Sequence, residues 1–106
     1  MSRVLAAHQP NYLPWLGLFH KLSLADVWVI ADDVQYTTHG LVNRNRIRTA
    51  TGWQWLTVPV LTRGRGRPQI REVMTAGASN WQRNHWEAIR WNYRHGHGFE
   101  EIGVFL

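Results

Sequence analysis

The stretch that decides the fold is residues 7–17, AHQPNYLPWLG. The apolar run before it predicts a buried strand over residues 3–8, and the mostly apolar segment after it predicts a helix over residues 15–25. Pro14 suits the first turn of that helix, because its missing N–H has no partner there. The stretch is therefore a strand-to-helix turn. In open α/β sheets, such turns lie at the carboxyl edge of the strands, where ligands bind.

A second strand follows at residues 27–31, VWVIA. This continuous apolar run is typical of a strand covered on both faces. Strand, helix and strand within about 30 residues predict a right-handed βαβ unit with parallel strands. Asp32 and Asp33 come directly after the second strand, so we expect them at the same sheet edge as the opening turn.

Two alternating segments, residues 44–49 and 53–58, predict a β-hairpin connected through residues 50–52. With a period of two, one face of the first strand carries Arg44, Arg46 and Arg48, and the other carries Asn43, Asn45 and Ile47. Three neighbouring cations repel one another unless they are solvated or bound to an anion. The row is therefore either an anion site or a charged edge that resists aggregation.

The remaining chain predicts a flexible basic loop at residues 63–68 (RGRGRP), a weak strand over residues 70–75 and a helix over residues 81–94. Ser79 and Asn80 are the candidate helix caps. The last eight residues are largely apolar and indicate an element that is cut short. The expected fold is α/β: a Rossmann-like βαβ unit with a β-hairpin and a C-terminal helix, part of a larger α/β domain.

Composition narrows the function classes. The 106 residues suffice for one domain, and eleven of the twelve cationic side chains in this chain of net charge +5 are arginine, which favours an anionic partner. Seven tryptophans indicate an aromatic core or a stacking surface. There is no cysteine and no apolar run long enough to span a membrane, so we expect a cytoplasmic protein.

Four side chains are candidates for chemistry. His8 ends the first strand and is a candidate acid, base or phosphate ligand. The alternative is a histidine that hydrogen-bonds to the local backbone. Asp32 and Asp33 are suited to a hydroxyl or to Mg²⁺, or else to capping a loop. His85, inside the apolar face of the last helix, is a second candidate base or a buried structural histidine. No histidine spacing indicates a metal site, and no glycine fingerprint indicates an NAD site.

Several colinear blocks resemble one protein family. They are residues 8–17, then Phe19, Lys21 and Asp26, then residues 32–36, 43–47 and 52–60, then Trp81, His85 and Trp86. In these blocks the chain resembles the N-terminal half of the WbqC-like family, whose members are about twice as long. The resemblance implies one WbqC-like domain over residues 1–106 that is truncated at its C-terminus. The family is bacterial, occurs in O-antigen and other surface-polysaccharide gene clusters, and includes a member for which glycine transfer has been suggested.

The resemblance thus implies a transferase of surface-polysaccharide biosynthesis, which moves an amino-acyl group such as glycine to an activated sugar. The expected catalytic residues are His8, His85 and Asp32. The expected substrate- and anion-binding residues are Gln9, Asn11, Tyr12, Asp33, Asn43, Arg44, Asn45, Arg46 and Arg48. The partner would be an anionic small molecule such as a nucleotide-sugar. A nucleic-acid-binding module and an inactive fragment of a nucleotide-binding enzyme remain the alternatives.

Overall fold

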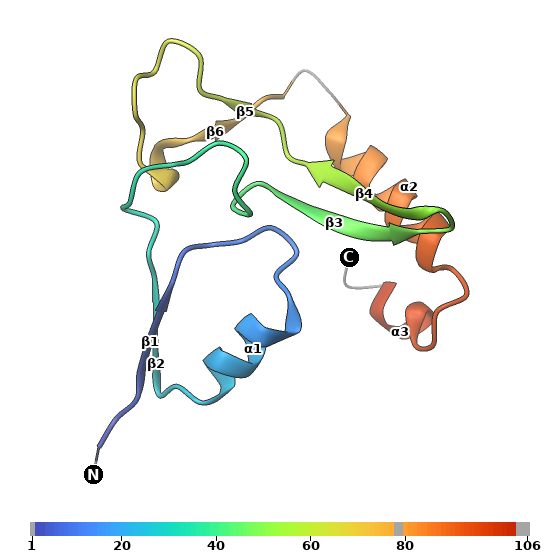
Figure 1. Cartoon of the computed structure of the whole chain (residues 1–106), viewed down its shortest axis with the longest axis horizontal. Helices are drawn as coiled ribbons and strands as arrows, with labels where there is room; N and C mark the ends of the chain where they lie inside the picture. The colour runs from blue at the N-terminus through green and yellow to red at the C-terminus, as the bar shows by residue number, and fades with distance from the viewer. Residues whose placement is uncertain (1, 78–79, 104–106) are drawn as a thin grey trace.

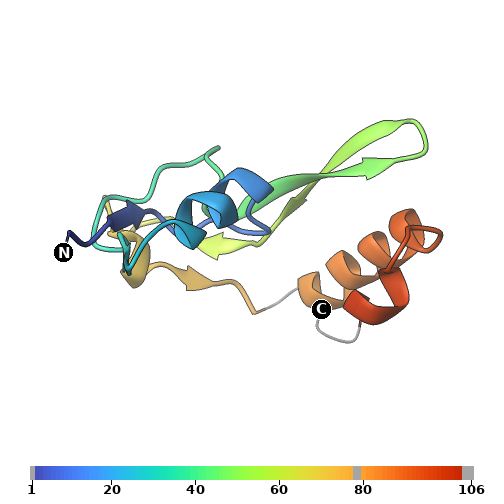
Figure 2. The ribbon, with the colours of Figure 1, turned by 90° about the horizontal axis from the view of Figure 1, so that it is seen from below.

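The computed structural model describes residues 2–77 and 80–103, which form a flat molecule of 45 × 44 × 24 Å (Figures 1 and 2). In chain order the elements are β1 (Leu5–His8), α1 (Leu16–Ser23), β2 (Val27–Ile30), β3 (Arg44–Thr49), β4 (Gly52–Thr57), β5 (Val60–Leu61), the 3₁₀ turn η1 (Ile70–Glu72), β6 (Met74–Thr75), α2 (Trp81–Tyr93) and α3 (Phe99–Gly103). The class is mixed α/β with three small sheets, as far as the described residues extend.

The parallel βαβ pairing is confirmed. β1 and β2 run parallel, in a register that starts at Leu5 opposite Val27 and ends at His8 opposite Ile30, with α1 between them in the chain. The prediction that β2 is covered on both faces is wrong, because all four of its residues are exposed. In the part of the chain that the structure describes, this sheet has two strands, so the wider Rossmann-like sheet is not observed.

α1 begins later than predicted. Its N-cap is Trp15, with extended backbone angles, and Pro14 lies outside the helix. Leu13, which comes just before Pro14, has a φ of +47°, a left-handed backbone conformation that residues other than glycine rarely adopt. Because the backbone of Trp15 is still extended, the first helical turn begins at Leu16. Only Leu18 of this helix is buried, although the segment is mostly apolar.

The predicted hairpin is confirmed. β3 pairs with β4 antiparallel from Arg44 opposite Thr57 to Thr49 opposite Gly52. The connection is the two residues Ala50 and Thr51, one residue shorter than expected. Gly52 has a φ of +144°, which explains the glycine at the point where the chain re-enters the sheet.

The predicted strand over residues 70–75 is largely wrong. The Glu72 carboxylate accepts a hydrogen bond from the Gln69 N–H at 2.9 Å, and this capping box closes the turn η1 instead. Only Met74 and Thr75 remain extended, and they pair antiparallel with β5. The Ile70 N–H donates to the Val34 carbonyl at 2.9 Å, which ties this segment to the loop after β2.

α2 agrees with the predicted helix to within one residue. Asn80 is its N-cap but makes no side-chain capping bond, and Ser79 lies outside the described residues. α3 folds back so that Phe99 stacks on Trp86, with 6.3 Å between ring centroids. α3 is the described part of the element expected to be cut short, and residues 104–106 lie outside the described residues.

The core has one part between β1 and α1 and another on the inner side of the hairpin. Its buried side chains are Ala6, Leu18, Tyr36, Ile47, Leu56, Val58 and His85. Ile47 and Leu56 belong to the inner face of the hairpin, the face that also carries Asn45. The Asn45 side-chain amide donates to the carbonyls of Tyr12 (3.2 Å) and Leu13 (2.7 Å). One asparagine therefore fixes the opening turn, including its left-handed residue, to β3.

Substitution Asn45→Ala tests this anchor. It leaves two carbonyls of the opening turn without their donor, and we expect a loss of about 1–3 kcal/mol in the free energy of unfolding. Urea denaturation followed by tryptophan fluorescence measures it. The matched control is Asn92→Ala, whose amide donates within α2 to Ala88 at 2.8 Å. Alanine is favoured in a helix interior, so the control should change stability by about 0.5 kcal/mol or less. Equal losses in the two variants would contradict the anchor.

Candidate functional site

The outer face of the hairpin combines arginine and tryptophan. Arg46 lies directly opposite Trp55, and Arg48 lies directly opposite Trp53. Directly opposed residues of an antiparallel pair project from the same face, so the tryptophans join the arginine row. We call this set the Arg–Trp face: Arg44, Arg46, Arg48, Trp53 and Trp55. The shared face of the three arginines is thus confirmed, and the two tryptophans were missed, because only the strand register places them there.

The side chains of this face stack on one another. The Arg44 guanidinium lies 3.9 Å from the centroid of the Trp55 ring, and that of Arg46 lies 4.9 Å from Trp53 and 5.6 Å from Trp55. The two indoles meet edge to face at 5.7 Å. Trp53 is 55% exposed and Trp55 is 38% exposed. Cation–π contacts of this kind hold the guanidinium groups in place while the face stays open to solvent.

The positive charge of this face is not neutralised by a carboxylate. Within residues 2–77 and 80–103, the one ion pair joins Arg90 to Glu87 on α2 at 2.7 Å. Arg44 donates to the carbonyls of His39 (2.7 Å) and Gly40 (3.3 Å), so its guanidinium partly clamps the preceding loop. The side chains of Arg46 and Arg48 make no hydrogen bond to any described residue. These two cations are the ones free to meet an anion.

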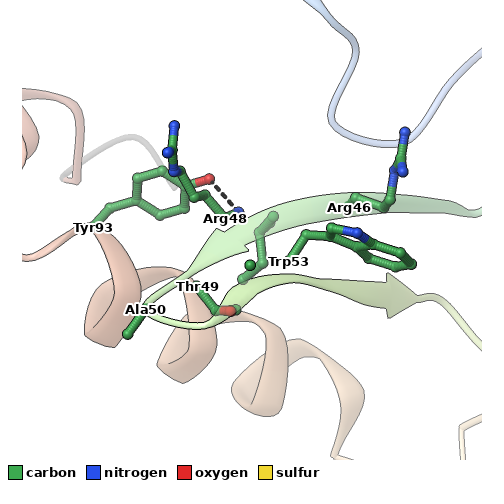
Figure 3. Close-up of a pocket in the computed structure, with 8 residues that line it drawn as sticks. Arg46, Arg48, Thr49, Ala50, Trp53 and Tyr93 are labelled. Carbon is green, nitrogen blue, oxygen red and sulfur yellow. Dashed lines mark hydrogen bonds between the residues drawn. The ribbon is translucent and has the colours of Figure 1, made fainter.

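An open hollow of about 780 Å³ adjoins this face at the tip of the hairpin (Figure 3). It is lined by Arg46, Ile47, Arg48, Thr49, Ala50, Gly52, Trp53 and Tyr93. Figure 3 shows Arg46 and Arg48 rising from the side of β3 that faces away from α2. Tyr93, the last residue of α2, closes one end, and its hydroxyl accepts a hydrogen bond from the Arg48 N–H at 2.8 Å. Tyr93 was not among the residues that the sequence predicted for the site.

Tyr12 and His85 form a second polar cluster, on the inner side of the hairpin. The Tyr12 hydroxyl lies 2.7 Å from Nδ1 of His85, and Nε2 of His85 lies 3.1 Å from the carbonyl of Thr57. A carbonyl only accepts, so Nε2 carries the proton and Nδ1 accepts from Tyr12. Burial lowers the pKa of His85, although the bond to Thr57 opposes this, and burial raises the pKa of Tyr12. His85 is therefore a neutral, buried imidazole with both nitrogens engaged.

A smaller hollow of about 230 Å³ borders this cluster. It is lined by Tyr12, Leu13, Trp81, Gln82, Trp86 and Ile89. The ring of Trp81 packs edge-on against His85, with centroids 5.4 Å apart. The ring centroids of Tyr12 and His85 lie 5.5 Å apart, so the opening turn and α2 share an aromatic contact as well as a hydrogen bond.

A third group of candidate site residues lies at the carboxyl edge of the β1–β2 sheet, where the sequence predicted a ligand site. His8, Gln9 and Asn11 line one apolar hollow of about 230 Å³ next to α1. Nδ1 of His8 lies 2.6 Å from the carbonyl of Gln9, so Nδ1 is the donor and Nε2 keeps a free lone pair. Asp32 and Asp33 follow β2 outside this hollow. In the described ranges they belong to no cluster of three potential metal ligands.

Two of the three asparagines expected to bind substrate, Asn43 and Asn45, are engaged internally. The Asn43 carbonyl oxygen accepts from the Tyr36 hydroxyl at 3.0 Å, and its amide donates to the Val58 carbonyl at 2.9 Å. Asn45 holds the opening turn as described above. The structure therefore divides the expected site residues into the Arg–Trp face, the inner cluster around His85, and the edge around His8.

The chain belongs to the WbqC-like protein family, whose family model matches residues 9–106. It is 43% identical over 102 residues to a relative from Mycobacterium tuberculosis, "Uncharacterized protein Rv1507c". That match covers 96% of this chain and 44% of the relative, so the chain spans less than half the length of the relative. No solved structure matches. None of the described helices is long and apolar enough to cross a membrane.

The neutral His85 predicts how stability depends on pH. Its pKa is lower in the folded protein than the ordinary value of 6.5, so the unfolded chain binds the proton more readily. Its contribution is complete above pH 6.5 and is lost as the pH falls through 6.5 toward the lower folded pKa. We expect the urea midpoint of the native protein to decrease as the pH is lowered from 8 to 5. In His85→Gln the midpoint should decrease less. The control Asn92→Ala, on the same helix, should keep the native slope. A native-like slope in His85→Gln would contradict the assignment.

Proposed function

We propose that this WbqC-family protein binds an anionic activated sugar, such as a nucleotide-sugar, on the Arg–Trp face. The observation that supports this most is the pair Arg46 and Arg48, two guanidinium groups without a carboxylate partner among the described residues, beside the exposed ring of Trp53. A guanidinium matches phosphate in two-point contact. An exposed indole offers a flat surface on which a base or a sugar ring stacks.

The adjoining hollow suits a ligand of this size. Its volume of about 780 Å³ lies within the range of roughly 300–1,000 Å³ that is usual for small-molecule sites. In the proposed arrangement, Arg46 and Arg48 hold the phosphates and Trp53 stacks on the base.

The proposed reaction is transfer of an acyl group, such as glycyl, from an activated ester or thioester donor to an amino or hydroxyl group of the sugar in surface-polysaccharide biosynthesis. The new C–N or C–O bond forms as the donor's C–O or C–S bond breaks, and the alcohol or thiol of the donor leaves. The family resemblance supplies this reaction class. His8 is the better of the two candidate bases, because Nε2 of His8 has a free lone pair, whereas His85 is buried with both nitrogens engaged. His8 lies at the β1–β2 edge and not in the hollow at the hairpin tip. It would take the proton of the attacking group at Nε2 from a sugar that extends from the Arg–Trp face to that edge. Asp32 and Asp33, which follow β2, would hold a sugar hydroxyl or Mg²⁺.

Single-stranded nucleic acid is the second candidate ligand, because the arginine row is long. Arg44 and Arg48 are four residues apart on one strand, or about 13 Å at roughly 3.3 Å per residue. This length exceeds a compact diphosphate and suits consecutive phosphates of an extended strand. Exposed tryptophans would stack on its bases.

Calorimetric titration with uridine diphosphate glucose tests the proposal. Arg46→Ala should weaken binding about 10-fold or more, since a hydrogen bond to a charged group is worth about 1.5–3 kcal/mol. Trp53→Ala should weaken it by a similar factor, since stacking of a base on an aromatic ring is worth about 1–3 kcal/mol. The control Arg83→Ala removes the same charge from the exposed surface of α2 and should have little effect. Equal losses in Arg83→Ala would indicate unspecific charge attraction. No response to the nucleotide-sugar, with oligothymidylate binding that weakens steeply with salt, would favour the nucleic-acid function.

A further inference from the structure

The β1–β2 sheet has one face that nothing in the described chain covers. Side chains alternate along both strands, so Leu5, Ala7, Val27 and Val29 share one face, and Ala6 and Trp28 share the other. α1 packs on the second face: the Trp28 indole N–H donates to the Leu22 carbonyl at 2.7 Å, and Ala6 is buried. Figure 2 shows α1 beside these strands. α1 covers its own face only in part, since Trp28 is 58% exposed and Ile30 is 67% exposed. No described element packs on the opposite face (Figure 1).

This uncovered face is apolar. Leu5 is 64% exposed, Val27 is 41% exposed and Val29 is 44% exposed. Parallel strands occur almost only where both faces of the sheet are covered, and residues as apolar as β2 are typical of such strands. The outer edges of β1 and β2 also pair with no other described strand. A patch with open edges and an apolar surface marks an interaction site.

We propose that the face of Leu5, Val27 and Val29 is the docking surface for a further α/β segment of WbqC-family polypeptide. A helix of that segment covers this face, and one of its strands pairs with an open edge of the sheet. The length of the relative supports this occupant: more than half of the mycobacterial protein lies outside the part matched by this chain. Helices on both faces of a parallel sheet are the usual way in which such sheets are completed.

A second copy of this chain is the competing occupant. Each copy carries a net charge of +5, so self-association brings like charges together. A family segment outside the matched region carries no such constraint. The proposal does not depend on the ligand of the Arg–Trp face, which lies on the hairpin.

Hydrogen exchange of this chain and of the full-length mycobacterial relative tests the proposal. In the relative, the amides that align with β1 and β2 should exchange at least 100-fold more slowly than those of this chain alone. Equal exchange in the two proteins would show that no segment of the relative covers the sheet. In sedimentation equilibrium this chain alone should be a monomer. A dimer with protected β1–β2 amides would overturn the proposal in favour of a second copy.

A charged substitution gives an independent check. Val29→Glu should leave the melting temperature of this chain within about 2 °C, because Val29 already faces solvent. The same change at the aligned position of the relative should lower its melting temperature by 5 °C or more, because there it would bury a carboxylate. The milder Val29→Thr keeps a β-branched side chain and should lower it less. Thr51→Glu, at the exposed hairpin tip, is the control for both proteins. If the glutamate substitution lowers the melting temperature of both proteins by the same small amount, the proposal is overturned.

Discussion

The hydrogen bond between the Tyr12 hydroxyl and Nδ1 of His85 joins residues 73 positions apart in the chain. His85 donates its other ring proton to the carbonyl of Thr57 on β4, so the imidazole must accept from Tyr12. The bond therefore has a fixed direction and connects the opening turn, the hairpin and α2. A charged His85 could not accept this bond, and burial lowers the pKa of His85, which favours the neutral ring. The rest of the arrangement depends on this buried polar contact.

The two faces of the hairpin have different roles because of this contact. On the inner face, Asn45 fixes the opening turn to β3, and His85 fixes it to α2. The inner polar groups are thereby satisfied within the protein. The Arg–Trp face looks outward, and its guanidinium groups are held by stacking on tryptophan. The interior supplies a rigid support, and the outward cations supply the binding capacity on which the proposed function rests.

The local pattern predicted much of this architecture. Period-two alternation predicted the hairpin and the shared face of its arginines, and the strand–helix–strand order predicted the parallel pair. The positions of Trp53 and Trp55 on the arginine face depend on the cross-strand register, which single residues do not indicate. The strand predicted at residues 70–75 failed because the bond between Gln69 and Glu72 closes a turn there. β2 was predicted to be buried from its apolar run, but all four of its residues are exposed. The pairing of Tyr12 with His85 is a tertiary contact that no local signal reveals.

The protonation of His85 tests the central claim most directly. Nitrogen-15 NMR of the histidine ring at pH 7 distinguishes the two neutral tautomers from the imidazolium ion. The account predicts a neutral ring with the proton on Nε2 and an unprotonated Nδ1 that accepts from Tyr12. A protonated ring, or a neutral ring with the proton on Nδ1, would contradict it. Either result would mean that the Tyr12–His85–Thr57 chain does not hold the opening turn against the hairpin and α2.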